Sequence, residues 1–231
     1  IDKILWHSSQ YYWLKLTLLA TILCSLIFIT LPEIDLLVAE LFFLGDNNFL
    51  LRNSMVHNFM DAWVRPSVKY LVMILVTLMA LSIFSNGKYI GWSIRSISFI
   101  VLTFAVGPGL LVNGILKEFI GRARPKNITE FGGDRLFSPA YFPSDQCAHN
   151  CSFVSGDVAF AFAFISFPLL LTGKKKKIGL LVCLLFGKSI AFYRLATGAH
   201  FLSDTVIAGL LSILVALICY IVIEERQSLQ N

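Results

Sequence analysis

The chain has 231 residues, of which 57% are hydrophobic and only 14% are charged, and its mean hydropathy is +0.75. A soluble domain carries about 25% charged residues, so this composition excludes a soluble globule, a disordered chain and a disulfide-rich secreted scaffold. The net charge of +5 is spread over short separate segments and not along one basic face, so nucleic-acid binding is not expected. The sequence predicts one membrane domain over residues 1–231.

Six apolar stretches come close to the roughly 20 residues that a helix needs to cross about 30 Å of hydrocarbon. They are Leu16–Leu31, Tyr70–Phe84, Ser96–Leu116, Phe153–Thr172, Ile178–Tyr193 and Thr205–Ile223. We therefore expect an all-α fold, a polytopic bundle of six transmembrane helices. The segment Ile34–Leu44 places its apolar residues along one helical face, which predicts a helix lying in the outer interface.

Positive charges in the connections predict the orientation of the bundle. Lys174–Lys177 form an unbroken basic run between the fourth and fifth stretches, and Lys88 and Arg95 flank the connection between the second and third. Because lysine and arginine accumulate in cytoplasmic loops, these connections should be cytoplasmic. Both termini, including Arg226, follow them to that side. The loops expected to face outward are residues 32–69, 117–152 and 194–204.

Three clusters of charged residues at the boundaries of the predicted spans gather on that outer side. A charge near the bilayer centre costs about 2.5–3.5 kcal/mol on insertion scales, so charges at span ends call for a reason. With their polar neighbours, they are Lys117, Arg122, Arg124, Ser155, Gly156, Asp157, Arg194, His200 and Asp204. The sequence predicts that they form one outward-facing active site within residues 117–204.

Five of these residues suit the binding of a phosphate group. Lys117, Arg124 and Arg194 supply three cations with few acids nearby, and guanidinium groups bind phosphate through forked, charge-assisted hydrogen bonds. Ser155 and Gly156 stand where a helix is expected to begin, with free backbone N–H groups aimed at an anion. The alternative reading of the cations is that they extend to lipid headgroups.

His200 and Asp204 lie four residues apart, on one face of the expected helix. A carboxylate in that place can hold one imidazole nitrogen protonated and leave the other free to attack phosphorus. The pair therefore predicts a nucleophile and its orienting partner.

The order and spacing of these residues resemble the three-motif signature of the type 2 phosphatidic acid phosphatase superfamily. In chain order the matching residues are Lys117, Arg124, Pro125, Ser155, Gly156, Arg194, His200 and Asp204. The resemblance implies a six-helix phosphatase that needs no metal and no cofactor. It further implies that His200 forms a phosphohistidine, that Asp204 orients it, and that the remaining polar residues bind phosphate.

One position departs from the superfamily pattern. Most members carry a histidine after Ser155-Gly156 that protonates the leaving alkoxide, whereas this chain has Asp157. A carboxylic acid can do so only if it is protonated before transfer: neighbouring cations favour its ionised form, while burial and a bound phosphate dianion favour its protonated form. His149 is an alternative donor.

The same departure narrows the resemblance. Segments 107–113, 121–125 and 146–157 are similar to those of bacterial lipid A 4′-phosphatases. This resemblance implies a phosphomonoesterase acting on lipid A at the periplasmic face of the bacterial inner membrane, with the bilayer and its lipid substrate as partners.

Cys147 and Cys151, four residues apart in an outward loop, are candidates for a disulfide. The alternative is a zinc site completed by His149, which offers only three local ligands.

Further candidates surround the site. Lys188, Arg122 and Arg135 are candidate headgroup contacts, and Asn113, one turn before Lys117, is a candidate to orient it. Three other charges are interpreted as loop charges: Asp46, Asp61 and Arg65.

Several functions compete with lipid A hydrolysis. The same site could serve undecaprenyl pyrophosphate, phosphatidylglycerophosphate or phosphatidic acid, or transfer phosphate to another lipid. A pyrophosphate has a better leaving group, so Asp157 in place of histidine gives that substrate some support. A different class, a non-catalytic lipid-binding or transport protein, would use intramembrane charges as a pathway.

Overall fold

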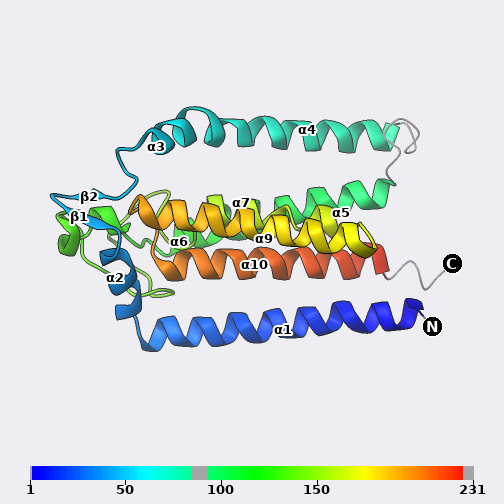
Figure 1. The fold of residues 1–231 in the computed structure, drawn as a ribbon, viewed down its shortest axis with the longest axis horizontal. Helices are drawn as coiled ribbons and strands as arrows, with labels where there is room; N and C mark the ends of the chain where they lie inside the picture. The colour runs from blue at the N-terminus through cyan, green and yellow to red at the C-terminus, as the bar shows by residue number, and fades with distance from the viewer. Residues whose placement is uncertain (1, 85–92, 226–231) are drawn as a thin grey trace.

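The computed structural model describes residues 2–84 and 93–225 and shows a bundle of long helices with short elements gathered at one end (Figure 1). The long helices and their extensions are α1 (Asp2–Thr30), α4 (Arg65–Phe84), α5 (Ile94–Phe104), the π-helical segment Ala105–Leu116, α6 (Lys117–Phe119), α9 (Gly173–Ala196), α10 (Leu202–Tyr220) and the π-helical segment Ile221–Glu225. The shorter elements are α2 (Glu33–Glu40), β1 (Phe43–Gly45), β2 (Asn48–Phe49), α3 (Met55–Phe59), the π-helical segment Met60–Val64, the 3₁₀ turns Pro125–Asn127 and Thr129–Phe131, α7 (Gly156–Ala163) and α8 (Ser166–Leu169). The strands β1 and β2 form one antiparallel pair.

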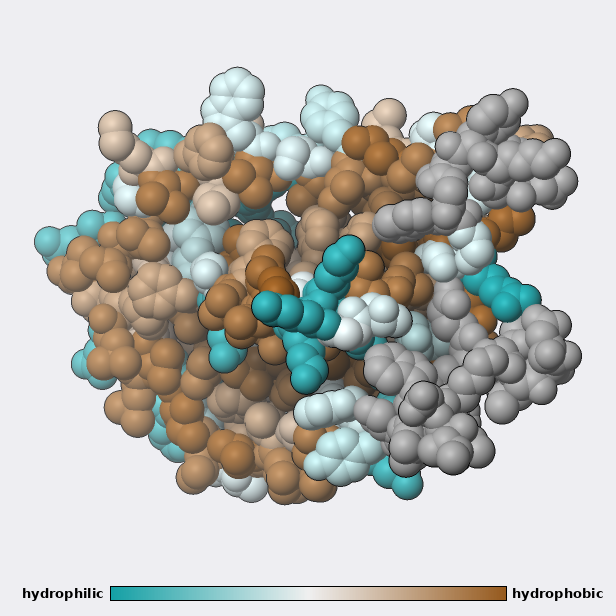
Figure 2. Space-filling model, turned by 45° about the vertical axis from the view of Figure 1, so that its right-hand side comes forward, coloured by the Kyte–Doolittle hydropathy of each residue, from teal (hydrophilic) through white to brown (hydrophobic). Residues whose placement is uncertain are grey.

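Five helices are long and apolar enough to cross a membrane, which confirms a predominantly helical, membrane-type chain. They are Gln10–Thr30, Met55–Ser82, Ile94–Phe119, Gly173–Ala196 and Leu202–Ile223. Apolar side chains also predominate on the face of the molecule shown in Figure 2.

All six predicted spans differ at one or both ends from the observed helices, and two of these differences affect the site. The stretch Phe153–Thr172 contains only the shorter apolar helix Gly156–Leu169, because residues 151–155 are not helical. The stretch Tyr70–Phe84 belongs to a longer helical run that begins at Met55. That run includes charged residues, and a search for uninterrupted apolar sequence therefore starts too late.

The two ends of the bundle hold different parts of the chain (Figure 1). The N-terminus and the start of α9, with its lysine run, lie at one end, whereas α2, the two strands and α6 lie at the other. The helix α2 runs across the end of the bundle, at a steep angle to α1. Lys88 and Arg226, used in the orientation argument, lie outside the described residues.

The helix α10 is the centre of the bundle and packs against α1, α5, α7 and α9. In the most apolar part of the spanning helix Leu202–Ile223, 56% of the residues are buried, whereas in that of Met55–Ser82 only 6% are. Glycines allow the close approach of its neighbours: a Cβ added at Gly187 of α9 would lie 2.6 Å from the ring of Phe162 on α7. In contrast, α4 packs mainly on α5. The first turns of α4 line the cavity described below.

Candidate active site

The predicted site residues come from three places in the chain that meet at one end of the bundle: α6 with the following loop, the start of α7, and the turn between α9 and α10. Most of them are withdrawn from the surface. The side chain of His200 is 1% exposed, that of Arg194 is 2% exposed, and Lys117 is 8% exposed as a residue. Burial of this many ionisable groups in one place is costly unless they interact.

His200 lies in the turn just before α10, with its imidazole fully enclosed. Its Nδ1 is 2.8 Å from the carbonyl oxygen of Ser152, so Nδ1 carries the proton and donates it, and Nε2 keeps the free lone pair. Burial lowers the pKa of His200 to about 3, and the carboxylate of Asp204, 3.5 Å away, offsets this only in part. The imidazole is therefore neutral at physiological pH, as a nucleophile must be.

The nearest acceptor of that proton is thus Ser152, and Asp204 acts at slightly longer range. Asp204 is fully buried and accepts hydrogen bonds from the Ser152 hydroxyl at 2.5 Å, from Arg122 Nη1 at 2.7 Å and from the backbone N–H of Phe201 at 2.8 Å. In the last bond, the side chain of Asp204 at position N3 accepts the backbone N–H of the N-cap residue Phe201, as in a capping box at the start of α10. Asp204 therefore fixes both the helix start and the loop that holds the imidazole.

The structure contradicts the interpretation of Arg122 as a headgroup contact. Its side chain is fully buried, with Nη2 2.7 Å from Asp35 Oδ2 and Nε donating to the carbonyl oxygen of Ser138 at 2.8 Å. The guanidinium also stacks over the ring of Phe201, 4.2 Å from its centroid. Arg122 supports Asp204 from inside the protein and has no path to a lipid headgroup.

The three predicted phosphate-binding cations lie close together. Lys117 Nζ donates to Asn150 Oδ1 at 2.8 Å, and Arg124 Nη2 donates to the carbonyl oxygen of Asn150 at 2.8 Å. Arg194 Nη1 lies 3.2 Å from Asp157 Oδ2. Two of these cations therefore have neutral partners, which leaves their charge available to an anion.

Two polar atoms at the site are buried and lack a hydrogen-bond partner among the residues that the structure describes. They are the hydroxyl oxygen of Ser155 and Nε of Arg194. The backbone N–H of Ser155 is bonded to the carbonyl oxygen of Asp204 at 3.0 Å, which fixes the start of α7 against α10. Unsatisfied buried polar groups are costly, and a phosphate oxygen would satisfy both atoms.

Gly156 is required by close packing, and its neighbour Asn113 has a different role from the predicted one. A Cβ at Gly156 would lie 2.6 Å from Asn113 Oδ1. The amide of Asn113 donates to the carbonyl oxygen of Pro108 at 2.6 Å. Asn113 therefore binds the backbone of its own π-helical segment and has no recorded bond to Lys117.

Asp157, 34% exposed, is held between two guanidinium groups, Arg194 at 3.2 Å and Arg65 at 3.6 Å. These contacts favour its ionised form. His149, the alternative proton donor, has a side chain that is 88% exposed and pairs with Glu118 at 3.4 Å on the surface.

The remaining candidates lie away from the cluster. Lys188 is exposed on α9 and does not line the cavity described below. Arg135 is half-exposed and pairs with Asp134 at 3.6 Å. Neither contacts the other predicted site residues.

Cys147 and Cys151 form a disulfide, with their Cα atoms 5.6 Å apart. This bond removes two of the three ligands of the zinc alternative. Within residues 2–84 and 93–225, no group of three or more His, Cys, Asp or Glu side chains is arranged to hold a metal ion.

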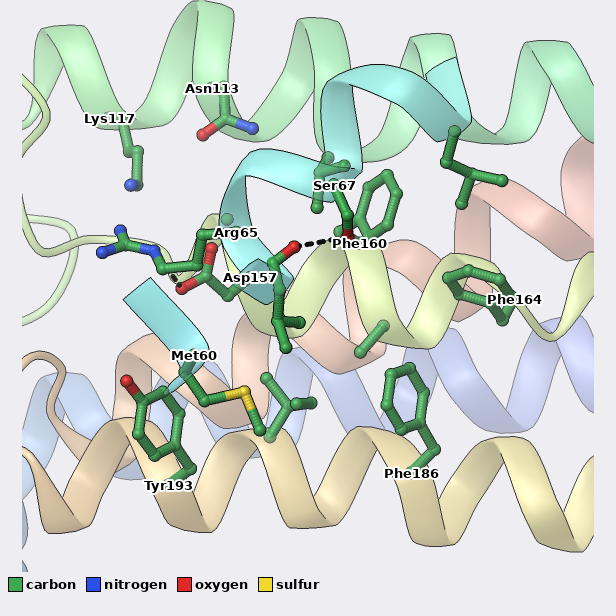
Figure 3. A pocket seen from close by; sticks show the side chains of 16 residues that line it. Met60, Arg65, Ser67, Asn113, Lys117, Asp157, Phe160, Phe164, Phe186 and Tyr193 are labelled. Atoms are coloured by element: carbon green, nitrogen blue, oxygen red, sulfur yellow. Dashed lines mark hydrogen bonds and ion pairs between the residues drawn. The ribbon is translucent and has the colours of Figure 1, made fainter. Parts of the chain in front are cut away.

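A cavity of about 270 Å³ lies between α4, α7, α9 and the π-helical segment Ala105–Leu116, and three residues of the cluster line it: Lys117, Gly156 and Asp157. Figure 3 shows Arg65, Lys117 and Asp157 at one end of the cavity and Phe164 and Phe186 at the other. One end therefore suits an anion and the other a hydrocarbon chain.

Sequence reasoning missed Arg65, which it interpreted as a loop charge. Arg65 is the first residue of α4 and lines the cavity. The signal for it in the sequence is the same as for Lys117, a cation at the end of a span on the side where the three motifs meet.

Comparison with known proteins agrees with the signature read from the motifs. Residues 96–228 match the model of the PAP2 superfamily. The chain is 40% identical over 117 residues to a lipid A 4′-phosphatase of Francisella tularensis subsp. novicida, covering 50% of this chain and 53% of that protein. It is 40% identical over 131 residues to a lipid A 4′-phosphatase of Rhizobium leguminosarum, covering 56% and 55%.

The chain thus spans about half the length of the curated relatives it matches. No solved structure shows significant similarity to it. Because the family match covers more than half of the chain and includes every residue of the three motifs, the chain belongs to the PAP2 superfamily.

Proposed function

We propose that the chain is a metal-independent lipid phosphatase that removes a phosphate monoester from lipid A through a phosphohistidine. The observation that carries the proposal is the convergence of Lys117, Arg124 and Arg194 on a buried, neutral His200 whose Nδ1 is already engaged. The similarity to lipid A 4′-phosphatases supports the choice of substrate.

In the proposed reaction, His200 Nε2 attacks phosphorus and a P–N bond forms as the bond from phosphorus to the lipid oxygen breaks. The three cations stabilise the charge on the phosphoryl oxygens, which is the main catalytic task in phosphoryl transfer. In this proposal the bound phosphate dianion raises the proton affinity of Asp157, which takes up a proton and then gives it to the leaving alkoxide. Water then attacks phosphorus and gives a proton back to the Asp157 carboxylate as the P–N bond breaks, and inorganic phosphate leaves with His200 neutral again.

The apolar end of the cavity supports a lipid substrate over a soluble phosphomonoester. Its lining includes a group of aromatic and aliphatic side chains: Val64, Val68, Leu71, Phe160, Phe164, Phe186 and Ile190. An acyl chain lying there would be removed from water while its phosphate reaches Lys117. The cavity thus accommodates both halves of an amphipathic substrate.

We further propose that the chain crosses the bacterial inner membrane six times and that its site faces the periplasm. The short apolar helix Gly156–Leu169 would be the sixth crossing, completed by flanking residues. The lysine run at the start of α9 supports a cytoplasmic location for the opposite end of the bundle.

The test is release of inorganic phosphate by purified protein in EDTA, from lipid A, phosphatidylglycerophosphate and undecaprenyl pyrophosphate in parallel. We expect lipid A to give the highest kcat/KM and EDTA to have no effect. Activity that disappears on chelation and returns with added metal would overturn the metal-independent mechanism. The absence of phosphate release from every lipid would favour a binding or transport protein.

Undecaprenyl pyrophosphate is a second candidate substrate, favoured by one observation. Asp157 is paired with both Arg194 and Arg65, and these contacts favour its ionised form when no substrate is bound. A pyrophosphate leaving group needs no general acid, and an ionised Asp157 would not hinder it. A higher kcat/KM for the pyrophosphate in the parallel assay would select this substrate.

A further inference from the structure

Arg65 lies at the outer end of α4, outside the segment of residues 96–228 that matches the family. Its side chain lies at the polar end of the cavity, beside Asp157 and near Lys117 (Figure 3). No motif of the signature includes this position, and only its contacts in the folded protein indicate a role.

Two guanidinium groups reach the same oxygen atom from different helices. Arg65 Nε is 3.6 Å, and Arg194 Nη1 is 3.2 Å, from Oδ2 of Asp157. An oxygen atom at this position can therefore bind a cation from α4 and a cation from α9 at the same time. A phosphate oxygen next to it would meet both guanidinium groups, and the second buried nitrogen of Arg194, Nε, has no partner among the described residues.

The charges around the site agree with this geometry. Burial lowers the pKa of Arg124, and the nearby positive charges of Arg194 and Arg65 lower it further, so the field of Arg65 reaches the phosphate-binding cations. Four cations, including Lys117, stand against Asp157 and the Asp61 that pairs with Arg65. The four cations and two carboxylates leave a charge of +2, which balances the −2 charge of a phosphate dianion.

A chain of contacts holds Arg65 toward the site. Its Nη1 is 3.0 Å from Asp61 Oδ1, one turn earlier on the same helical run. Asp61 Oδ2 is 3.6 Å from His57 Nε2, and His57 Nδ1 is 2.8 Å from the hydroxyl of Tyr193, next to Arg194 on α9. Arg65 is therefore braced from its own helix and indirectly from α9.

We propose that Arg65 is a substrate-binding residue whose guanidinium binds an oxygen of the substrate's phosphate group on the side shared with Arg194 and Asp157. The proposal rests on the proposed function and deepens it. It adds α4 to the elements that bind phosphate, and so predicts that a helix with little packing of its own contributes directly to anion affinity.

The test measures binding of orthovanadate and orthophosphate to purified protein by calorimetry, together with kcat/KM for lipid A. Loss of a hydrogen bond to a charged group should weaken binding by about 10–100-fold. We expect this loss in Arg65→Ala and a smaller one in Arg65→Lys, which keeps the charge without the fork. The control is Arg95→Ala, which removes an exposed cation at the other end of the bundle and should bind as the wild type does.

A merely structural role, in which Arg65 only holds Asp157, predicts a different result in the Asp157→Asn background. There, adding Arg65→Ala should change nothing if holding Asp157 is its only task. It should still weaken vanadate binding about 10-fold or more if Arg65 binds phosphate. Thermal unfolding identifies misfolded variants. If Arg65→Ala does not fold, vanadate binding by Arg65→Lys in the same background replaces it in the comparison.

The outcomes separate this inference from the proposed function. Wild-type affinity for vanadate in the Arg65 variants would overturn the role of Arg65 and leave the phosphatase proposal standing. A wild-type protein that binds neither anion and releases no phosphate from any lipid would overturn both.

Discussion

Arg122 and Asp35 form a fully buried ion pair, with 2.7 Å between Nη2 and Oδ2. Asp35 also accepts the backbone N–H of Ser203 at 2.8 Å and its hydroxyl at 2.5 Å. Ser203 lies in the first turn of α10, whose N-cap residue is Phe201 and has no side-chain acceptor. Asp35, from α2, therefore caps α10 from another part of the chain. Arg122 pairs with both Asp35 and Asp204, and so links the two carboxylates.

We expect Asp35→Ala and Arg122→Ala each to lower the free energy of unfolding by about 3–5 kcal/mol, because each leaves a buried charge without its partner. The double variant should lose less than the sum of the two single losses. Denaturant unfolding in detergent measures both effects. Glu40→Ala, which removes an exposed acid from the same helix, is the control and should change little. Additive losses would contradict the coupling of Asp35 and Arg122.

The pKa of His200 predicts a dependence of stability on pH. Burial lowers this pKa to about 3 in the folded protein, whereas an unfolded histidine titrates near about 6.5. As the pH falls from about 6.5 toward 3, the unfolded chain takes up a proton that the folded chain does not, so the contribution of His200 to stability is lost. Above about 6.5 this contribution is fully present.

The comparison is between wild type and His200→Asn, which cannot titrate. Between pH 7 and pH 5 the wild type should lose about 2 kcal/mol more unfolding free energy than the variant. Unfolding curves at both pH values measure this difference. The same loss in both proteins would mean that His200 is not held neutral by the fold.

Asp157→Asn tests the proposed proton donor. Asparagine keeps the shape of the side chain but has no transferable acidic proton, so turnover of a lipid phosphomonoester should fall by about 10²–10⁴-fold. A phosphate ester of an activated phenol needs no protonation and should be affected far less. The measurement is the ratio of turnover on the lipid phosphomonoester to turnover on the phenol ester, compared between wild type and variant. Equal losses on both substrates would assign Asp157 only to holding Arg65 and Arg194.

The orientation of the bundle is tested with a pair of exposed positions at its two ends. Asp134→Cys and Lys175→Cys, each in a background with the natural cysteines replaced, are treated with a membrane-impermeant maleimide in intact spheroplasts. We expect labelling at residue 134 and none at residue 175 until the membrane is opened. The reverse pattern would place the site in the cytoplasm and remove an outer-leaflet lipid as substrate.

The sequence was sufficient for the helical membrane fold and for the three-motif cluster, since long apolar runs and fixed spacings need no knowledge of long-range contacts. It predicted Arg122 wrongly because a cation at a span end looks the same whether it faces lipid or a buried carboxylate. The missing information was Asp35, 87 residues away. Asp35 shares a face of α2 with Val38 and Ala39, three and four residues later. An acid on an apolar face was the available signal.

Arg65 was missed for a different reason. Uninterrupted apolar sequence begins only at Tyr70, whereas the helical run starts at Met55. A search for apolar sequence therefore leaves Arg65 in the preceding loop. Its contact with Asp157 depends on how α4 lies against α7 and α9, which no local pattern specifies.

Trapping of the covalent intermediate tests the central claim most directly. Lipid A carrying ³²P in its 4′-phosphate is mixed with the protein in EDTA and quenched in alkali within milliseconds to seconds. If the reaction passes through a phosphohistidine, the protein-bound label is stable in alkali, labile in acid and located on His200, and folded His200→Ala carries no label. Steady turnover of wild type without any bound label, or a label that persists in His200→Ala, would contradict this claim.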